Sequence, residues 1–112
     1  MADTRQVQTI DRSRLISYSF SPGARAELAK VTARYRDEAS EKVANDFVLE
    51  LGRALDLARR FPTLGTPDSK STRKLLLIDF PHALVYRIQD EHLRIIAIAH
   101  ERKRARYWRG RT

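Results

Sequence analysis

The sequence contains no cysteine, which excludes a disulfide framework, a thiolate metal site and a thiol nucleophile. The three histidines, His82, His92 and His100, are scattered without Glu-x-x-His or His-x-x-x-His spacing, so we expect no metal and no cofactor. Apolar runs such as residues 95–99 are far shorter than the roughly 20 residues that cross a bilayer. Residues 1–17 lack the apolar stretch and cleavage site of a secretory signal. These absences predict a cytoplasmic protein without a membrane span.

The chain has 112 residues, a length that suits one domain because either half alone is too small to bury a core. Hydrophobic residues make up 42% and charged residues 32%, a composition typical of a folded globular protein. Residues 1–16 are polar and without sustained periodicity, so we expect a flexible N-terminal leader or a start codon placed too early. Residues 17–112 are then expected to form a single domain.

Positive charge is concentrated at the C-terminal end. The formal net charge is +8, from 22 Lys and Arg against 14 Asp and Glu. Residues 100–112 contain one acid, Glu101, and six basic residues: Arg102, Lys103, Arg104, Arg106, Arg109 and Arg111. Such a concentration indicates binding to nucleic acid, to an acidic protein, or to both.

Hydrophobic periodicity predicts a strand followed by two helices. Residues 17–21 alternate serine with aromatic residues, as a short strand does. Ser21 followed by Pro22 predicts the start of a helix that ends near Asp37, with one apolar stripe. Ser40 predicts the cap of a second, longer helix. The apolar stripe of the first helix is Ala24, Leu28, Val31 and Tyr35, and that of the second is Ala44, Phe47, Val48, Leu51, Leu55 and Ala58.

Three strands are expected in the second half of the chain. Residues 61–67 contain two prolines and a glycine, which end the second helix. Strand-like runs follow at 73–80, 83–89 and 93–100, and their short connections imply antiparallel hairpins. The predicted fold class is therefore α+β, a helical hairpin packed on a small antiparallel sheet in the order β-α-α-β-β-β.

This order, together with several motifs, resembles the RelE/ParE toxin superfamily of type II toxin-antitoxin systems, and the ParE branch in particular. The resemblance extends from about Tyr18 to Arg111. Ala105 departs from it, because the ParE pattern usually has proline there, and this loosens the expected turn. The motifs are Arg73-Lys74-Leu75-Leu76-Leu77, an aromatic-proline turn Phe80-Pro81 before Val85-Tyr86-Arg87, His100-x-Arg102-x-Arg104, and Tyr107-Trp108.

The resemblance implies a bacterial toxin that inhibits growth or serves plasmid stabilization, and that a cognate antitoxin neutralises. ParE-type members inhibit DNA gyrase, whereas RelE-type members cleave mRNA on the ribosome. The gyrase alternative is favoured by the Tyr107-Trp108 ending, and we then expect an inhibitor rather than an enzyme. Residues expected to bind the target are Arg87, Arg102, Arg104, Arg106, Tyr107, Trp108 and Arg109.

The ribosome-dependent endoribonuclease stays open as the second hypothesis. RNA cleavage needs a base near the ribose 2′-hydroxyl, a proton donor for the leaving oxygen and cations over the phosphate. Such an endoribonuclease would need no metal. The residues that could supply these groups are Arg73, Arg87, His100, Arg102 and Tyr107, and Arg104 is a further candidate.

A structural role competes with each of these assignments. His100 is expected to close the sheet through a hydrogen bond, and Tyr86 and Tyr107 to pack at the edges of the core. Trp108 is expected to anchor the C-terminal residues on the domain. Arg87, in the middle of a central strand, should face a groove or pair with Asp79 or a partner's carboxylate, because an unpaired buried guanidinium is costly.

Overall fold

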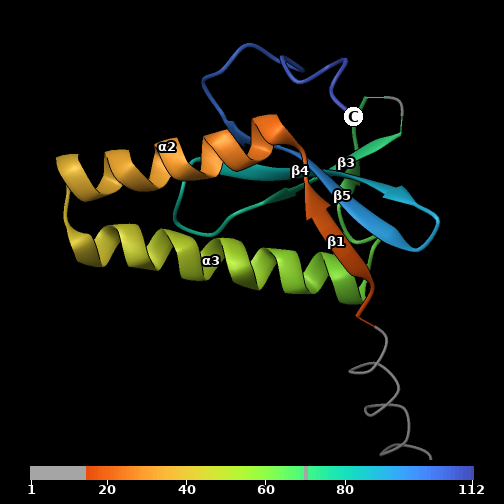
Figure 1. Ribbon diagram of the computed structural model, residues 1–112, viewed down its shortest axis with the longest axis horizontal. Coiled ribbons are helices and arrows are strands. Elements are labelled where there is room, and N and C mark those ends of the chain that lie inside the picture. Colours follow the sequence, from red (N-terminus) through yellow and green to blue (C-terminus); the bar gives the residue numbers. More distant parts are fainter. Residues whose placement is uncertain (1–14, 70) are drawn as a thin grey trace, which may run out of the picture.

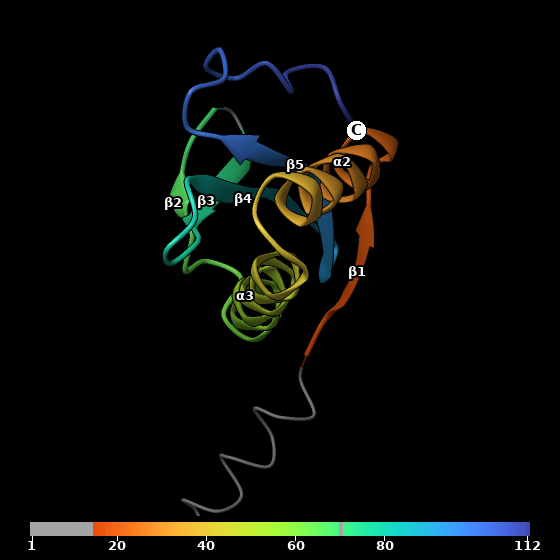
Figure 2. The same cartoon turned by 90° about the vertical axis from the view of Figure 1, so that its left-hand side faces the viewer.

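The computed structural model describes residues 15–69 and 71–112. Two long helices lie side by side against one face of a five-stranded sheet (Figures 1 and 2). This confirms the predicted α+β class and the packing of a helical hairpin on a sheet. The elements are β1 (Ser17–Phe20), α2 (Pro22–Glu38), α3 (Glu41–Arg60), β2 (Thr66–Pro67), β3 (Thr72–Leu76), β4 (His82–Gln89) and β5 (His92–His100).

Both helices begin at the serine caps that the sequence predicts. The Ser21 hydroxyl accepts a hydrogen bond from the Ala24 amide at 3.1 Å, and the Ser40 hydroxyl accepts one from the Val43 amide at 3.1 Å. Each bond satisfies one of the backbone N–H groups that a helix leaves free in its first turn.

The apolar stripes of the two helices face the sheet. Nearly all the predicted inward residues of α3 are buried, and the α2 stripe is buried or packs against the same core. Val48 is the exception, with 44% of its surface exposed. It lies about 100° around the helix from Phe47, beyond the width of α3 that the sheet and α2 cover, so its assignment to the inward face was wrong.

The sheet has the strand order β1-β5-β4-β3-β2 and is mixed. The three strands β3, β4 and β5 form the predicted antiparallel hairpins, and Asp90 and Glu91 make the β4–β5 turn with positive φ angles of 49° and 60°. The sheet is not antiparallel throughout, because β1 runs parallel to β5. A parallel pair needs a long connection, and α2 and α3 lie within the chain segment that joins these two strands.

The strand predicted for residues 73–80 is shorter than expected, because β3 ends at Leu76. Asp79 adopts a positive φ of 67°, which a continuing strand does not accommodate. The Ile78 amide instead donates to the Glu50 carboxylate at 2.6 Å and ties this loop to α3. The two-residue strand β2, which pairs with β3, lies within the segment that the sequence predicts as a loop.

Residues 1–14 of the predicted leader lie outside the described residues. Ile16, also assigned to the leader, packs against the core, and its carbonyl accepts a hydrogen bond from Arg59 Nε at 2.7 Å. Ile16 therefore belongs to the folded domain and not to a separate leader. Within residues 15–69 and 71–112, no helix is long and apolar enough to span a bilayer.

Alternation along the strands separates two hydrophobic clusters. Leu84, Tyr86 and Ile95 face the helices and belong to the main core. Val85 and Ile96 belong to a second cluster, whose cover is Trp108. The helices thus cover one face of the sheet and the C-terminal residues cover the other.

Tyr86 is fully buried and holds the loop after α3 with its hydroxyl. That hydroxyl donates to the Pro62 carbonyl at 2.7 Å and accepts from the Gly65 amide at 2.9 Å. We predict that Tyr86→Phe lowers the free energy of unfolding by about 1–3 kcal/mol, because the buried Gly65 amide and the partly buried Pro62 carbonyl lose their partner. Urea unfolding followed by circular dichroism measures this. Tyr18→Phe, the same change on a ring that is 43% exposed, is the control and should leave stability nearly unchanged; equal effects would contradict the assignment.

Candidate functional site

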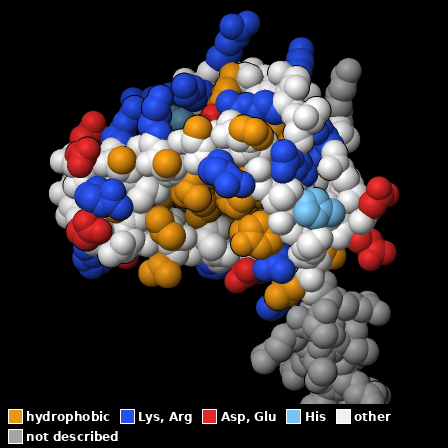
Figure 3. Space-filling view, viewed as in Figure 1, with side chains coloured by type: hydrophobic (Ala, Val, Ile, Leu, Met, Phe, Trp, Pro, Cys, Tyr) orange, Lys and Arg blue, Asp and Glu red, His pale blue; other side chains and the backbone are white. Residues whose placement is uncertain are grey.

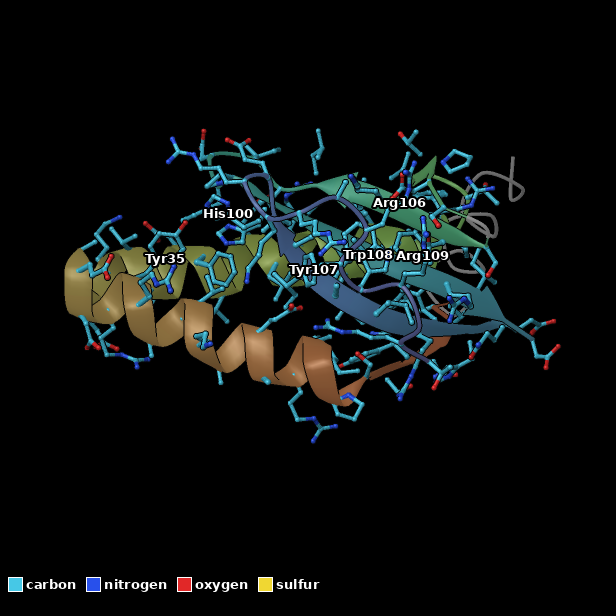
Figure 4. The ribbon with its side chains drawn as sticks, turned by 90° about the horizontal axis from the view of Figure 1, so that it is seen from above. Tyr35, His100, Arg106, Tyr107, Trp108 and Arg109 are labelled. Atoms are coloured by element: carbon cyan, nitrogen blue, oxygen red, sulfur yellow. The ribbon has the colours of Figure 1, made fainter. Side chains whose placement is uncertain are left out.

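The last twelve residues, 101–112, form a segment that we call the tail, and it crosses the sheet on the side away from the helices (Figure 4). Trp108 is 4% exposed and packs against Val85, Ile96 and Ala99. The ammonium group of Lys74 lies 5.7 Å from the centroid of its indole ring. Trp108 is therefore an anchor, as the sequence predicts, and not an exposed contact for a target.

A second anchor is the Glu27 carboxylate on α2. Its Oε1 accepts hydrogen bonds from the Ile98 amide at 2.9 Å and from Arg111 Nη1 at 3.1 Å. Its Oε2 accepts from the Tyr107 hydroxyl at 2.6 Å and from Arg111 Nη2 at 3.2 Å. A single carboxylate thus joins helix α2, strand β5 and two residues of the tail.

The end of the tail is also held through its backbone by arginines of the sheet. Arg87 Nη1 donates to the Arg111 carbonyl at 3.4 Å and Arg94 Nε donates to a Thr112 main-chain oxygen at 2.8 Å. Arg87 also donates to the Ser71 hydroxyl at 2.9 Å. Of the three alternatives given for Arg87, pairing with Asp79 is wrong, because Asp79 lies in the loop before β4 whereas Arg87 lies near the other end of that strand.

The remaining cations of the tail are exposed. Arg106 lies 3.7 Å from Asp68, and in the described chain Arg102, Arg104 and Arg109 make no ion pair. Figure 3 shows Lys and Arg side chains gathered along the upper rim of the molecule, where the tail lies. Two of the five tail arginines are thus neutralised by the chain's own acids, and the others are available to a partner.

The residues proposed for RNA cleavage do not share one surface. Arg73 pairs across the sheet with Tyr86, on the face toward the helices, where it donates to the Gly65 carbonyl at 2.8 Å. Arg87 is the next residue after Tyr86 and lies on the opposite face. His100 pairs with His82 on the helix side. Sequence spacing suggested one site, whereas the sheet separates its members.

Tyr107 is poorly suited to proton transfer. Burial raises the pKa of its hydroxyl well above the ordinary value, and the hydrogen bond and negative charge of Glu27 raise the pKa further, although Arg111 opposes them. In Figure 4 its ring lies between the tail and α2. The hydroxyl is engaged as a structural donor.

His82 and His100 form an edge-to-face pair with ring centroids 4.9 Å apart. His100 Nδ1 accepts from the Arg102 amide at 2.9 Å, which confirms the predicted closing hydrogen bond. Burial, together with the smaller effects of His100 and Arg34, lowers the pKa of His82 from 6.5 to about 4, although the negative charge of Glu27 opposes the shift. His82 is 5% exposed, and its Nδ1 has no hydrogen-bond partner among the described residues.

A groove of about 700 Å³ separates α2 from the tail. Its lining contains one acid, Glu27, and five Lys and Arg residues: Lys30, Arg34, Arg102, Lys103 and Arg111. Within residues 15–69 and 71–112, no group of three or more His, Asp or Glu side chains could hold a metal ion.

Two residues that hold the tail, Glu27 and Arg94, are not among those predicted from the sequence. Glu27 is the only acid between Pro22 and Arg36, on the border of an apolar stripe, and this isolation is the signal that could have singled it out. Arg94 alternates with buried residues on β5 and resembles an ordinary exposed strand position. Its hydrogen bond to the Thr112 main-chain oxygen depends on the folded path of the tail, so no local pattern in the sequence indicates it.

Comparisons with known proteins identify a family and a related fold. The family described as "ParE toxin of type II toxin-antitoxin system, parDE" matches residues 18–105. Among solved structures, a chain of the "Chromosomal ParDE TA system from P. aeruginosa" has a TM-score of 0.69 and 18% sequence identity, covering 78% of this chain and 97% of its own. A search of curated proteins gave no match.

The buried His82 predicts a stability that falls in acid. Between pH 6.5 and about 4 the unfolded chain binds a proton at this residue that the folded chain does not, so unfolding becomes easier as the pH falls through that window. We expect a loss of up to roughly 3 kcal/mol from this residue. Urea unfolding at several pH values measures the slope. His82→Phe, which keeps a ring beside Tyr35 and Phe47, should flatten it; an unchanged slope would rule out His82 as the source.

Proposed function

The chain belongs to the ParE toxin family of type II toxin-antitoxin systems, and on this premise we propose that it inhibits DNA gyrase by binding and is neutralised by a cognate antitoxin. The family match, which covers residues 18–105, is the observation that carries the proposal. The toxin would act in the cytoplasm, where gyrase is found.

Action by binding rather than by catalysis is supported by the positions of the nuclease candidates. Arg73 and Arg87 lie on opposite faces of the sheet, and the Tyr107 hydroxyl donates to Glu27. General acid-base catalysis needs its groups within hydrogen-bond reach of one scissile bond. The separation of these side chains therefore favours the inhibitor over the ribosome-dependent endoribonuclease.

Target binding is assigned to the exposed cations of the tail. Arg102, Arg104 and Arg109 are exposed and lie on a segment that Trp108 fixes to the sheet. A cationic surface attracts the anionic complex of gyrase with DNA and accelerates encounter. Arg87 and Trp108, both expected among the target-binding residues, would act indirectly by holding the tail.

Neutralisation calls for a partner of opposite charge. With a formal charge of +8, the chain is complemented by an acidic antitoxin segment, folded or extended on its surface. A pull-down with the product of the adjacent gene tests the partnership, and failure to bind would count against it.

We predict that Arg104→Glu with Arg109→Glu weakens inhibition of gyrase supercoiling at least tenfold, since reversal of two exposed charges removes attraction and adds repulsion. Arg25→Glu with Arg60→Glu is the matched control, because it makes the same change in net charge at exposed positions of α2 and α3. A supercoiling assay with purified gyrase and a titration of each toxin variant measures the effect. Unimpaired supercoiling at saturating wild-type toxin would refute gyrase inhibition itself.

The nuclease alternative has its own assay. Primer extension on ribosome-bound mRNA should show no cuts in phase with codons when the wild-type chain is added. Codon-phased cuts that Arg87→Ala and Tyr107→Phe abolish would reverse the order of the two hypotheses.

A further inference from the structure

Cationic side chains line both walls of the groove between α2 and the tail. Lys30 and Arg34 belong to α2, and Arg102 and Lys103 belong to the tail. Among residues 15–69 and 71–112, none of these four side chains makes an ion pair. The fold therefore holds four cations around one hollow without a carboxylate for any of them.

The acid in the lining does not compensate for these cations, because it is already paired. Both oxygens of Glu27 bind Arg111, at 3.1 and 3.2 Å, and one of them also accepts the Tyr107 hydroxyl. With both histidines neutral, five cations and one carboxylate give the groove a formal charge of +4. Repulsion between like charges is relieved by an anion, so the groove favours a ligand with several negative charges.

His82 and His100 line the groove at the end of the sheet where β4 begins and β5 ends (Figure 4). His82 is 5% exposed, and its Nδ1 has no hydrogen-bond partner among the described residues. An unsatisfied buried polar group is uncommon and calls for a specific cause. Burial is the main reason for the lowered pKa of His82, and the positive charges of His100 and Arg34 add to it. An anion in the groove would supply the negative potential that this end lacks.

The backbone groups of β5 beside the groove are already engaged. The Ile96 carbonyl accepts from Ser21 Oγ at 3.0 Å and from Arg111 Nη1 at 3.2 Å. The Ile98 amide donates to Glu27 at 2.9 Å. A ligand that enters the groove and leaves these bonds intact therefore meets charged side chains rather than free backbone.

We propose that this groove binds the phosphate groups of a nucleotide, with Arg34, His100 and Arg102 around the phosphates. A chain of phosphates carries several negative charges on closely spaced oxygens and so matches a charge of +4, whereas one carboxylate carries a single charge. Guanidinium groups donate parallel hydrogen bonds to phosphate oxygens. The groove volume of about 700 Å³ lies within the roughly 300–1,000 Å³ of small-molecule sites. The site is independent of the target that the toxin inhibits.

The groove has little with which to distinguish one base from another. The Tyr107 hydroxyl is bonded to Glu27, and the cations of Lys103 and Arg111 lie 5.5 and 5.2 Å from the centroid of its ring, so the ring is not a free platform for base stacking. Apart from the two histidines, the uncharged residues that line the groove are Gly23, Ala26, Val31, Ile98 and Tyr107. We therefore expect affinity to depend on the number of phosphates and not on the base.

Titration calorimetry of the full chain with ATP, GTP and AMP in magnesium-free buffer measures this dependence. ATP and GTP should bind alike, and both should bind more tightly than AMP, because each added phosphate contributes negative charge. Equal affinity for AMP and ATP would contradict recognition by charge. Failure of ATP to bind the wild-type chain would overturn the site.

Arg34→Gln tests the assignment to this groove. The variant should bind ATP about tenfold more weakly, since one guanidinium and its charge-assisted hydrogen bonds are lost. Arg25→Gln is the matched control, because it removes the same charge from an exposed position of the same helix and Arg25 does not line the groove. Equal weakening by the two variants would reduce the effect to general charge attraction and refute a defined site.

The titration of His82 is a second measurement, made on the wild-type chain. The charged groups that act on this ring are His100, Arg34 and Glu27, and the rings of Tyr35 and Phe47 pack against it. A nearby phosphate stabilises the protonated imidazole, so saturating ATP should raise the pKa of His82 from about 4. NMR of the histidine ring protons over a pH series measures the pKa. An unchanged value would place the nucleotide elsewhere and overturn the proposal.

A thymidine oligonucleotide without a terminal phosphate separates a free nucleotide from a nucleic acid chain, which offers the same phosphate chemistry. Weaker binding of the oligonucleotide than of ATP supports a free nucleotide. Tighter binding of the oligonucleotide, with the same loss in Arg34→Gln, would keep the phosphate site and assign it to nucleic acid. Oligonucleotide and ATP binding that both ignore Arg34→Gln would overturn the site.

Discussion

The Glu27 carboxylate is the interaction on which the arrangement of the C-terminal residues depends. It accepts four hydrogen bonds, from the Ile98 backbone, from Tyr107 and twice from Arg111, and so connects α2, β5 and the tail at one point. A carboxylate has about four acceptor positions, and all of them are used here. The carboxylate holds the tail against the sheet through Tyr107 and Arg111. The arginines of the tail that do not bind Glu27 remain exposed.

Different residues of the tail hold it to the sheet and face solvent. Trp108 fills the cluster on the sheet face away from the helices, and Arg87 and Arg94 bind the last main-chain oxygens. The exposed arginines are thereby held near one another without a helix or strand of their own. A fixed cluster of like charge attracts an anionic partner more effectively than the same charges on a free chain, because less conformational entropy is lost on binding.

Most of the fold could be predicted from local patterns. The Ser21 and Ser40 caps, the helical stripes and the hairpin turn at Asp90 and Glu91 each depend on residues close in sequence. The errors fell where distant segments decide the outcome. Val48 is exposed because neither α2 nor the sheet reaches it, and β3 stops early because Glu50 of α3 holds the loop that follows. Neither cause can be read from the neighbouring residues.

The sequence by itself determined the two helices, the three antiparallel strands, the concentration of positive charge and the resemblance that the family match confirms. Only the tertiary structure decided that Arg73 and Arg87 face opposite sides of the sheet, that β1 is parallel to β5, and that Glu27 binds the tail. The physical reason is that periodicity and capping are local, whereas strand pairing and the contacts of one carboxylate join residues up to 84 positions apart.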